Sequence, residues 1–359
     1  MGGGMENNTQ LFRLEGGLLN CFPEPVVLVD HLGNVLASNE ASESEIGITY
    51  PGKALAMSFR HPSAIEAVES VLRSGKPQNV EVTFLAPAAR TFNLIVAPLS
   101  ESAFHGLEGR GAVLVFHDVT AERRAEQMRA DFVANASHEL RSPLSSMTGF
   151  IETLQGPAKE DPVAREKFLS IMSAECGRMA RLIEDLLSLS AIESNEHVAP
   201  SDEIDIRTLL FGAKDALSPT ATAADINVII DIPEVFPLII GDIDQLSQVF
   251  RNLMENAIAY GGKGSEVKIV ATIEDRMPDS DRPGVSIAVI DAGEGIPRKH
   301  LTRLTERFYR VDKARSRTAG GTGLGLAIVK HIVSRHRGRL SVDSKVGQGS
   351  RFTVLLPSA

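Results

Sequence analysis

The sequence predicts an α+β multidomain protein, because its pattern changes three times along 359 residues. Short β-type runs alternate with turns over residues 19–118, a helical spacing of apolar residues dominates 119–195, and strands alternate with helices over 196–359. Residues 1–18 carry no such pattern and are expected to form a flexible tail.

The segment 19–118 is expected to form a small antiparallel sheet with helices on one face. "EPVVLVDHLGNVLASN" predicts two strands joined by a turn at Gly33, and "HPSAIEAVESVLRSG" predicts a helix from Pro62 to Arg73. "NVEVTFLA", "TFNLIVAPL" and "GAVLVFHDV" predict three further strands in a meander. This order, closing on Asp118-Val119-Thr120, resembles a PAS sensor domain.

The segment 119–195 is expected to form two long helices joined by a short loop. Apolar residues recur at three-four spacing from Ala121 to Leu154, "GPAKEDP" interrupts them, and a second stripe runs from Phe168 to Leu189. A single hairpin of this kind leaves an apolar seam uncovered, so we expect two chains to pair into a four-helix-bundle homodimer. A coiled-coil spacer without chemistry is the alternative interpretation.

The composition excludes several classes of protein. A net charge of −9 without an extended Lys/Arg block argues against a nucleic-acid partner. Two cysteines in no metal-ligand spacing indicate a reducing compartment. No apolar run approaches the roughly 18 residues that cross a bilayer. We therefore expect a cytoplasmic location without evident membrane contact, with an anchor outside this sequence as the alternative.

The first chemical candidate is "ASHELRSPL", which places His138 beside Glu139 and five residues before Pro143. Proline lacks an N–H, and its ring crowds the carbonyl four residues back, which belongs to Glu139. The helix is therefore expected to be loosened beneath the His–Glu pair. Taken alone, the stretch is ambiguous, because most histidines are ordinary surface or core residues.

Three further motifs lie in the segment 196–359. In "RNLMENAIAY", Asn252 and Asn256 share a helix face with Tyr260, and an Asn carbonyl is a hard oxygen ligand suited to Mg²⁺. The same residues also fit an ordinary polar helix surface. Tyr260 lies one turn further along that face, where its ring is placed to cover a planar base.

"DAGEGIP" follows the predicted strand "VSIAVI" and begins with Asp291. The motif fits an ordinary turn as well as a nucleotide site. In the functional interpretation, Asp291 accepts a hydrogen bond from an exocyclic amine, while Gly293 and Gly295 allow a flat base to approach closely.

"GGTGLGLAIVK", residues 320–330, is a glycine-rich turn that runs into a helix N-terminus, an arrangement that offers N–H groups to phosphate. The polar "VDKARSRTA" before it is typical of a lid. It excludes the dinucleotide-binding alternative, which needs a strand at that place.

In order, "SHELRSPL", "RNLMENA", "DAGEGIP", "RFYRVD" and "GGTGLGLAIVK" resemble the two-component sensor histidine kinases over residues 120–359. The resemblance implies a helical dimerisation and phosphoacceptor hairpin, then an α/β sandwich ATP-binding domain of the gyrase/Hsp90/MutL type. It also implies ATP and Mg²⁺ as cofactors and the receiver domain of a separate response regulator as partner.

The resemblance further implies a role for each matching residue. His138 matches the phosphorylated histidine, and Glu139 its acid/base neighbour. Asn256 matches the Mg²⁺ ligand, and Asp291 the adenine-reading aspartate. The other matching positions belong to the nucleotide site or its lid: Asn252, Tyr260, Gly293, Gly295, Arg310, Gly321, Gly323, Leu324 and Gly325.

The sequence departs from the family pattern at three positions. Ser142 stands where threonine is usual in the acid-x-x-Thr pattern that supports phosphatase activity, so a weaker phosphatase is expected. Ala259 occupies a position where a basic residue is common, and Ala292 replaces a frequent polar residue.

Two other classes of protein remain as alternatives. An ATPase machine of the same fold would not need "SHELRSP" on a dimer helix. A silent scaffold would not need His138, Asn256, Asp291 and the lid glycines together.

Overall fold

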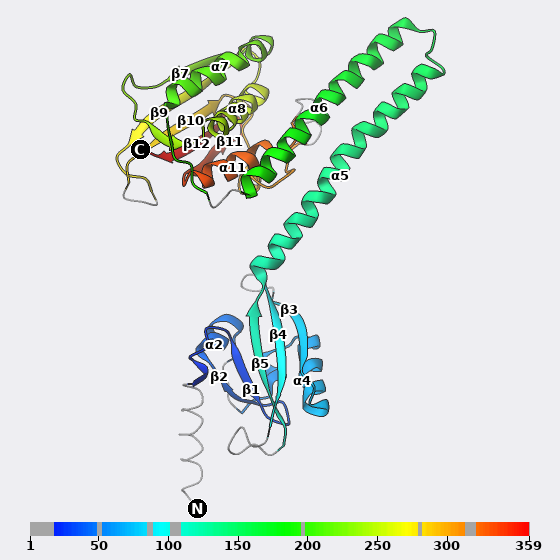
Figure 1. Ribbon diagram of the computed structural model, residues 1–359, viewed down its shortest axis with the longest axis vertical. Helices are drawn as coiled ribbons and strands as arrows, with labels where there is room; N and C mark the ends of the chain where they lie inside the picture. The colour runs from blue at the N-terminus through cyan, green and yellow to red at the C-terminus, as the bar shows by residue number, and fades with distance from the viewer. Residues whose placement is uncertain are drawn as a thin grey trace, which may run out of the picture. The chain divides into compact units, whose positions relative to one another are not determined.

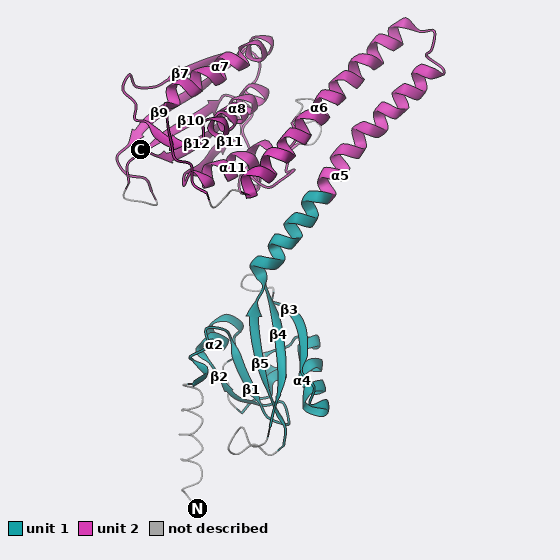
Figure 2. Cartoon of the chain, in the orientation of Figure 1, with its two compact units in different colours: residues 1–133 teal, residues 134–359 magenta. Residues whose placement is uncertain are grey.

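The computed structural model describes residues 18–48, 52–84, 89–100, 109–194, 198–278, 282–312 and 321–358. The expected tail, except Leu18, and most of the expected lid lie outside these ranges. Two compact units divide the chain, residues 1–133 and 134–359, and their boundary falls within one long helix (Figure 2).

Unit 1 contains a five-stranded antiparallel sheet in the order β2-β1-β5-β4-β3 within its described residues (Figure 1). The strands are β1 Val26–Val29, β2 Val35–Ser38, β3 Gln78–Phe84, β4 Arg90–Leu99 and β5 Gly111–Asp118. The expected hairpin at Gly33 and the meander of the last three strands are confirmed, and Gly33 has a φ of 78°. The pairing of β1 with β5 was not foreseen.

The helices of unit 1 are α2 Glu40–Ile46, α3 Leu55–Ser58 and α4 Pro62–Ser74. Helix α4 packs on β3, β4 and β5 and ends at Gly75, as the sequence predicts. Alternate residues of β4 face this helix layer, so Phe92, Leu94 and Val96 are buried in the core. Aromatic rings fill the core, with the centroids of Phe59 and Phe116 5.5 Å apart.

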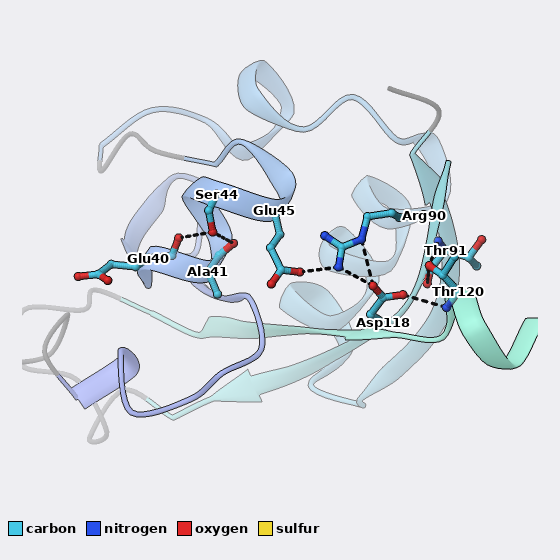
Figure 3. A network of polar contacts seen from close by, with 8 residues as sticks. All are labelled: Glu40, Ala41, Ser44, Glu45, Arg90, Thr91, Asp118 and Thr120. Atoms are coloured by element: carbon cyan, nitrogen blue, oxygen red, sulfur yellow. Dashed lines mark hydrogen bonds and ion pairs between the residues drawn. The ribbon is translucent and has the colours of Figure 1, made fainter. Parts of the chain in front are cut away.

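A polar network joins β4 and α2 to the point where β5 passes into helix α5, Thr120–Gln155 (Figure 3). The Arg90 guanidinium lies 2.6 Å from Asp118 Oδ2 and 3.1 Å from Glu45 Oε2. Asp118 also accepts a 2.8 Å hydrogen bond from the Thr120 backbone, and the Thr120 hydroxyl accepts one of 2.8 Å from the Thr91 backbone. The first turn of α5 is therefore fastened to the sheet of unit 1.

Unit 2 begins within α5 and continues into α6, Pro162–Ser194. The two helices run antiparallel and form the predicted hairpin (Figure 1). The Phe150 and Phe168 rings stack with centroids 5.1 Å apart, and Cys176 Sγ lies 3.5 Å from Met147 Sδ. Helix α5 is continuous through Pro143, which is buried. No helix among the described residues combines the length and apolarity needed to span a bilayer.

The rest of unit 2 is an α/β sandwich, as predicted. Its described sheet has the order β11-β12-β10-β9-β7, with only β7 and β9 parallel within it. Helices α7, α8 and α11 form a layer on this sheet, because α8 contacts both other helices and also β9 and β10 (Figure 1). The strands are β7 Asn227–Asp231, β9 Glu266–Glu274, β10 Gly284–Asp291, β11 Arg339–Lys345 and β12 Gly349–Pro357.

The helices of this sandwich are α7 Ile206–Ala223, α8 Ile243–Tyr260, the short α9 Arg298–Leu301 and α11 Gly325–Arg335. A separate ribbon pairs β6 Asp202–Ile204 with β8 Ile239–Gly241. Neither this ribbon nor α7 was predicted.

The start of α8 shows how the sandwich is held together. The spacing of Asp242 and Gln245 in the sequence predicts a capping box. Half of it is confirmed, because Asp242 caps the helix by accepting a 3.2 Å hydrogen bond from the Gln245 backbone. The other half is wrong, because the Gln245 side-chain oxygen is buried without a hydrogen-bond partner among the described residues. The Asp242 N–H donates instead to His336 Nε2, at 3.0 Å, from the end of α11.

Candidate functional site

The candidate phosphoacceptor lies on the hairpin. His138 and Ser142 are exposed on α5, one helical turn apart, and Glu139 between them is half-buried. A neighbour on a helix points about 100° away, so Glu139 and His138 face different directions. The sequence therefore leaves the imidazole open to solvent while its acidic neighbour faces the rest of unit 2.

Helix α8 supplies the polar face that the sequence predicts. Its buried residues follow three-four spacing, which places Asn252 and Asn256 together at the margin of the apolar stripe, and both are half-buried. The Asn252 amide donates a 3.4 Å hydrogen bond to the carbonyl of Gly325, the first residue of α11. This face of α8 therefore lies against the glycine-rich turn.

The last residue of β10 is Asp291, whose side chain is only 6% exposed. Burial raises the pKa of this carboxyl group, and hydrogen bonds from Gly293 and Ser350 partly offset that effect. The Gly293 N–H lies 2.9 Å from Asp291 Oδ1. The strand end thus presents a sheltered acceptor.

The two glycines after Asp291 are required by their surroundings. A Cβ atom added to Gly293 would lie 2.1 Å from the Tyr260 carbonyl oxygen. Gly295 has a φ of 71°, and a Cβ there would lie 2.1 Å from the Lys345 carbonyl oxygen. The contact at Gly293 brings the end of α8 against the Asp291 loop. The Tyr260 side chain is half-buried at this junction.

The glycine-rich turn leads directly into α11. Leu324 is fully buried at the N-cap position, and Gly325 begins the helix. The Leu324 N–H donates a 3.3 Å hydrogen bond to the Thr322 hydroxyl, and Gly323 has a φ of 77°. Gly321 lines a small pocket at the start of this turn. Helix α8 therefore contacts both the turn and the Asp291 loop, so the structure brings these predicted elements together.

Arg310 connects the α/β sandwich to the hairpin. Its side chain is 8% exposed, and its Nη2 atom lies 3.2 Å from Glu139 Oε2. Its Nε atom is buried without a hydrogen-bond partner among the described residues. The pocket that Gly321 lines is also lined by Glu139, Pro143 and Arg310, so the acid next to His138 faces the start of the turn.

A second contact between hairpin and sandwich was not predicted. The Thr322 hydroxyl donates a 2.6 Å hydrogen bond to Asp185 Oδ2 on α6. Burial raises the pKa of Asp185, and burial likewise raises the pKa of Glu255, the residue before Asn256 on α8. Asp185 is half-buried beside the turn, whereas the Glu255 side chain is 51% exposed.

Further contacts extend this interface toward the end of α6. Arg307 forms an ion pair with Glu193, and the Ser188 hydroxyl donates a 2.9 Å hydrogen bond to Gln248 of α8. Arg307 is the first residue of "RFYRVD", but no role was predicted for it, and Glu193, Ser188 and Gln248 lie outside the motifs. Acidic residues among apolar neighbours on α6 were the feature of the sequence that could have indicated these contacts.

A divalent cation would suit this environment. Asn256 offers a hard amide oxygen. It is half-buried and lies one turn after Asn252, whose amide bonds to the first residue of α11. The residues present therefore fit a divalent cation that keeps most of its ligands from water and phosphate.

Comparison with known proteins assigns a class to each half of unit 2. Residues 241–359 match the histidine kinase-, DNA gyrase B- and HSP90-like ATPases. Residues 128–195 match the His Kinase A (phospho-acceptor) domain. An ATPase sandwich joined to a phosphoacceptor hairpin defines a protein-histidine kinase.

The chain belongs to the sensor histidine kinases of two-component systems. It is 34% identical over 338 residues to the phosphate regulon sensor protein PhoR of Pseudomonas aeruginosa, covering 92% of this chain and 71% of that protein. It is 40% identical over 247 residues to the sensor protein kinase WalK of Staphylococcus aureus, covering 69% of this chain and 58% of that protein.

A solved structure supports the fold. Histidine kinase ThkA, in complex with the response regulator protein TrrA, aligns with a TM-score of 0.51 and 20% identity. The alignment covers 94% of this chain and 96% of that one.

Proposed function

We propose that this kinase phosphorylates its own His138 from Mg-ATP and passes the phosphoryl group to an aspartate in the receiver domain of a separate response regulator. The observation that carries the proposal is the contact between Glu139 and Arg310. It brings the acid next to the exposed histidine against the start of the glycine-rich turn.

The residues of the hairpin are suited to this transfer. One nitrogen of a neutral imidazole attacks the γ-phosphorus of ATP, the bond from phosphorus to the bridging oxygen breaks, and ADP leaves. The other ring nitrogen keeps its proton. Once released from Arg310, the Glu139 side chain would turn toward the ring, accept a hydrogen bond from that N–H and balance the positive charge that the ring acquires. Most of the rate enhancement comes from positioning and electrostatics.

The nucleotide would occupy the surface between α8, the Asp291 loop and the glycine-rich turn. Asp291 accepts the hydrogen bond of the adenine amine, and Gly293 and Gly295 leave room for the base, with Tyr260 at its edge. The N-terminus of α11 attracts the phosphates through Gly323, Leu324 and Gly325. These roles also account for the close approach of Tyr260 to Gly293.

Asn256 would hold Mg²⁺, and Asn252 would keep the neighbouring turn in place through its bond to Gly325. The bound ion supplies positive charge that offsets the phosphates. Arg310 lies at the boundary between hairpin and sandwich, where it is placed to meet either Glu139 or a phosphate.

A homodimer follows from the exposed apolar side chains of the hairpin. Five of them are Leu144, Ile151, Leu169, Ile183 and Leu187. A second copy of the hairpin would cover this seam in a four-helix bundle.

Unit 1 is proposed to be a PAS-like sensor. Its antiparallel sheet, with helices inserted between β2 and β3, agrees with that type, and its last strand leads directly into α5. The proposed domains are therefore the sensor at 19–118, the phosphotransfer hairpin at 119–195 and the ATP-binding domain at 196–359.

The test is labelling of the purified chain with γ-labelled ATP. Wild type should gain acid-labile, alkali-stable label, and His138→Gln should gain none while keeping ATP binding and the dimer. His117→Gln, which removes an exposed histidine of unit 1, is the control and should label normally. Label retained on His138→Gln would overturn the assignment. Adding a panel of purified receiver domains should then move the label, but not to receivers lacking the acceptor aspartate.

A further inference from the structure

We propose that Arg178 is a positioning residue for Glu139 during phosphoryl transfer. The inference rests on the proposed function, because it concerns the acid that supports His138. Arg178 lies on α6, the helix of the hairpin that does not carry the histidine, and none of the predicted motifs includes it.

Arg178 lies between two carboxylates. Its Nε atom is 3.1 Å from Glu175 Oε2, one turn back on the same helix, and its Nη1 atom is 4.0 Å from Glu139 Oε2 on α5. The Arg178 side chain is only 15% exposed. It also lines the pocket that Glu139 and Pro143 line.

Glu139 has two cationic neighbours, and they belong to different parts of unit 2. Arg310 comes from the ATP-binding sandwich and lies 3.2 Å from Oε2, the same oxygen that Arg178 approaches. While Arg310 holds this oxygen, Glu139 is already paired with a cation. It is then not available to accept a hydrogen bond from the histidine N–H. Arg310 must therefore leave Glu139 before the transfer.

Arg178 does not leave with the sandwich, because it and Glu139 both belong to the hairpin. It then becomes the nearest cation to the carboxylate and limits the positions that its oxygens can take. Displacement of a supporting group by about 1 Å is enough to cost orders of magnitude in rate.

The guanidinium group suits this role better than an ammonium group. Its planar fork donates toward Glu175 and Glu139 at the same time, whereas lysine is a flexible point charge. A purely structural role is the competing explanation. The Arg178–Glu175 pair at i,i+3 would then contribute only a few tenths of a kcal/mol to the hairpin.

The experiment is a double-mutant cycle on full-length chain, measured as the initial rate of His138 labelling. Arg178→Ala should lower the rate at saturating ATP about tenfold and leave the ATP concentration for half-maximal rate unchanged. Arg178→Lys should recover only part of the rate. In a Glu139→Ala background, adding Arg178→Ala should cause no further loss.

Arg165→Ala is the matched control, because it removes an exposed arginine from the same helix. It should label at the wild-type rate. Thermal unfolding of every variant checks that the hairpin is intact, and Arg178→Lys keeps the test valid if the alanine variant unfolds. The inference would be overturned if Arg178→Ala labelled at the wild-type rate. It would also be overturned if the loss of rate in the double variant equalled the product of the losses in Arg178→Ala and Glu139→Ala. If either of these results is found while His138→Gln still loses its label, the role of Arg178 is wrong but the proposed function stands.

Discussion

The Thr322 hydroxyl donates a 2.6 Å hydrogen bond to the carboxylate of Asp185, and this contact ties the glycine-rich turn to the second helix of the hairpin. The same hydroxyl accepts a hydrogen bond from the Leu324 N–H, so it also shapes the start of α11. A hairpin carboxylate therefore lies close to the helix end that would receive the phosphates of ATP.

Asp185→Asn should bind ATP more tightly than wild type, by about threefold, because it removes a negative charge near the phosphates. The amide oxygen still accepts the Thr322 hydroxyl, so the turn keeps its shape. Titration with a fluorescent ATP analogue measures the effect. Glu184→Gln removes an exposed acid from the neighbouring position and should leave the affinity unchanged. Equal affinities for Asp185→Asn and wild type would contradict this role of the charge.

Asp291→Asn should weaken ATP binding by about 1–3 kcal/mol, since a buried carboxylate acceptor is replaced by an amide that also presents N–H. The raised pKa of Asp291 means that the folded state favours the protonated form. Stability from this group is complete below the unfolded pKa and is lost as pH rises through the folded pKa. The variant should therefore be more stable than wild type without ATP at neutral pH.

Calorimetric titration and thermal unfolding measure the two opposite effects of Asp291→Asn. Asp231→Asn, at the exposed end of β7, is the control for both. The ATP affinity of wild type should also fall as the pH decreases. The fall should begin at a higher pH than it would for an aspartate with an ordinary pKa. A variant that binds ATP as wild type does would remove Asp291 from the adenine site.

His336→Ala should lower the free energy of unfolding of the sandwich by about 2 kcal/mol. Its ring accepts from the Asp242 N–H and bonds through Nδ1 to the Ile332 carbonyl at 2.8 Å, which requires the neutral ring with hydrogen on Nδ1. Burial lowers the pKa of His336. Its contribution is therefore complete above the unfolded pKa of about 6.5 and is lost as pH falls from there through the folded pKa.

Urea unfolding at a series of pH values measures the His336 effect. His336→Gln should reduce the loss of stability between pH 6.5 and the folded pKa. If wild type and both variants show the same pH profile, His336 does not contribute in this way.

Arg90→Ala should loosen the junction between the sheet of unit 1 and α5. Burial alone would raise the pKa of Asp118, but hydrogen bonds from Thr120 and Arg90 outweigh it, so the pKa is lowered. The network's contribution is thus present above the unfolded pKa and lost as pH falls through the folded one. Because the ion pairs are partly exposed, we expect a loss of about 1 kcal/mol.

Hydrogen exchange of backbone amides at residues 118–123 should be faster in Arg90→Ala than in wild type. Arg73→Ala, at the end of α4, is the control. Unchanged exchange at the start of α5 would show that the network does not hold this helix.

Ser142→Ala should abolish dephosphorylation of a phosphorylated receiver domain and leave His138 labelling intact, because the hydroxyl one turn after His138 is lost. Ser142→Thr should increase dephosphorylation, since the added methyl group restricts χ1. Decay of purified phospho-receiver in the presence of ADP measures both. A Ser142→Ala variant that dephosphorylates as quickly as wild type would end this assignment.

The local elements were predictable because local patterns determine them. Alternation of buried residues in β4 and three-four spacing in α8 are set by strand and helix geometry, so these elements appear where the sequence places them. The glycines at 293 and 295 were singled out for the approach of a base, whereas the structure shows that each is needed because a backbone carbonyl lies close to it.

Contacts between distant segments were not predictable from those patterns. Asp185 meets Thr322 across 137 positions of sequence, and His336 meets Asp242 across 94. Gln245 looked like the partner of the Asp242 N–H because a capping box is local, but a distant histidine takes its place. The short ribbon of β6 and β8 escaped notice because three residues carry too little periodicity.

The "RFYRVD" motif is bonded to the glycine-rich turn, since the Phe308 N–H donates a 2.8 Å hydrogen bond to the Gly323 carbonyl. The bond joins the backbone two residues before Arg310 to the residue before Leu324. The segment that carries the ion pair with Glu139 and the first residues of α11 are therefore fastened to each other, so a shift of one strains the other.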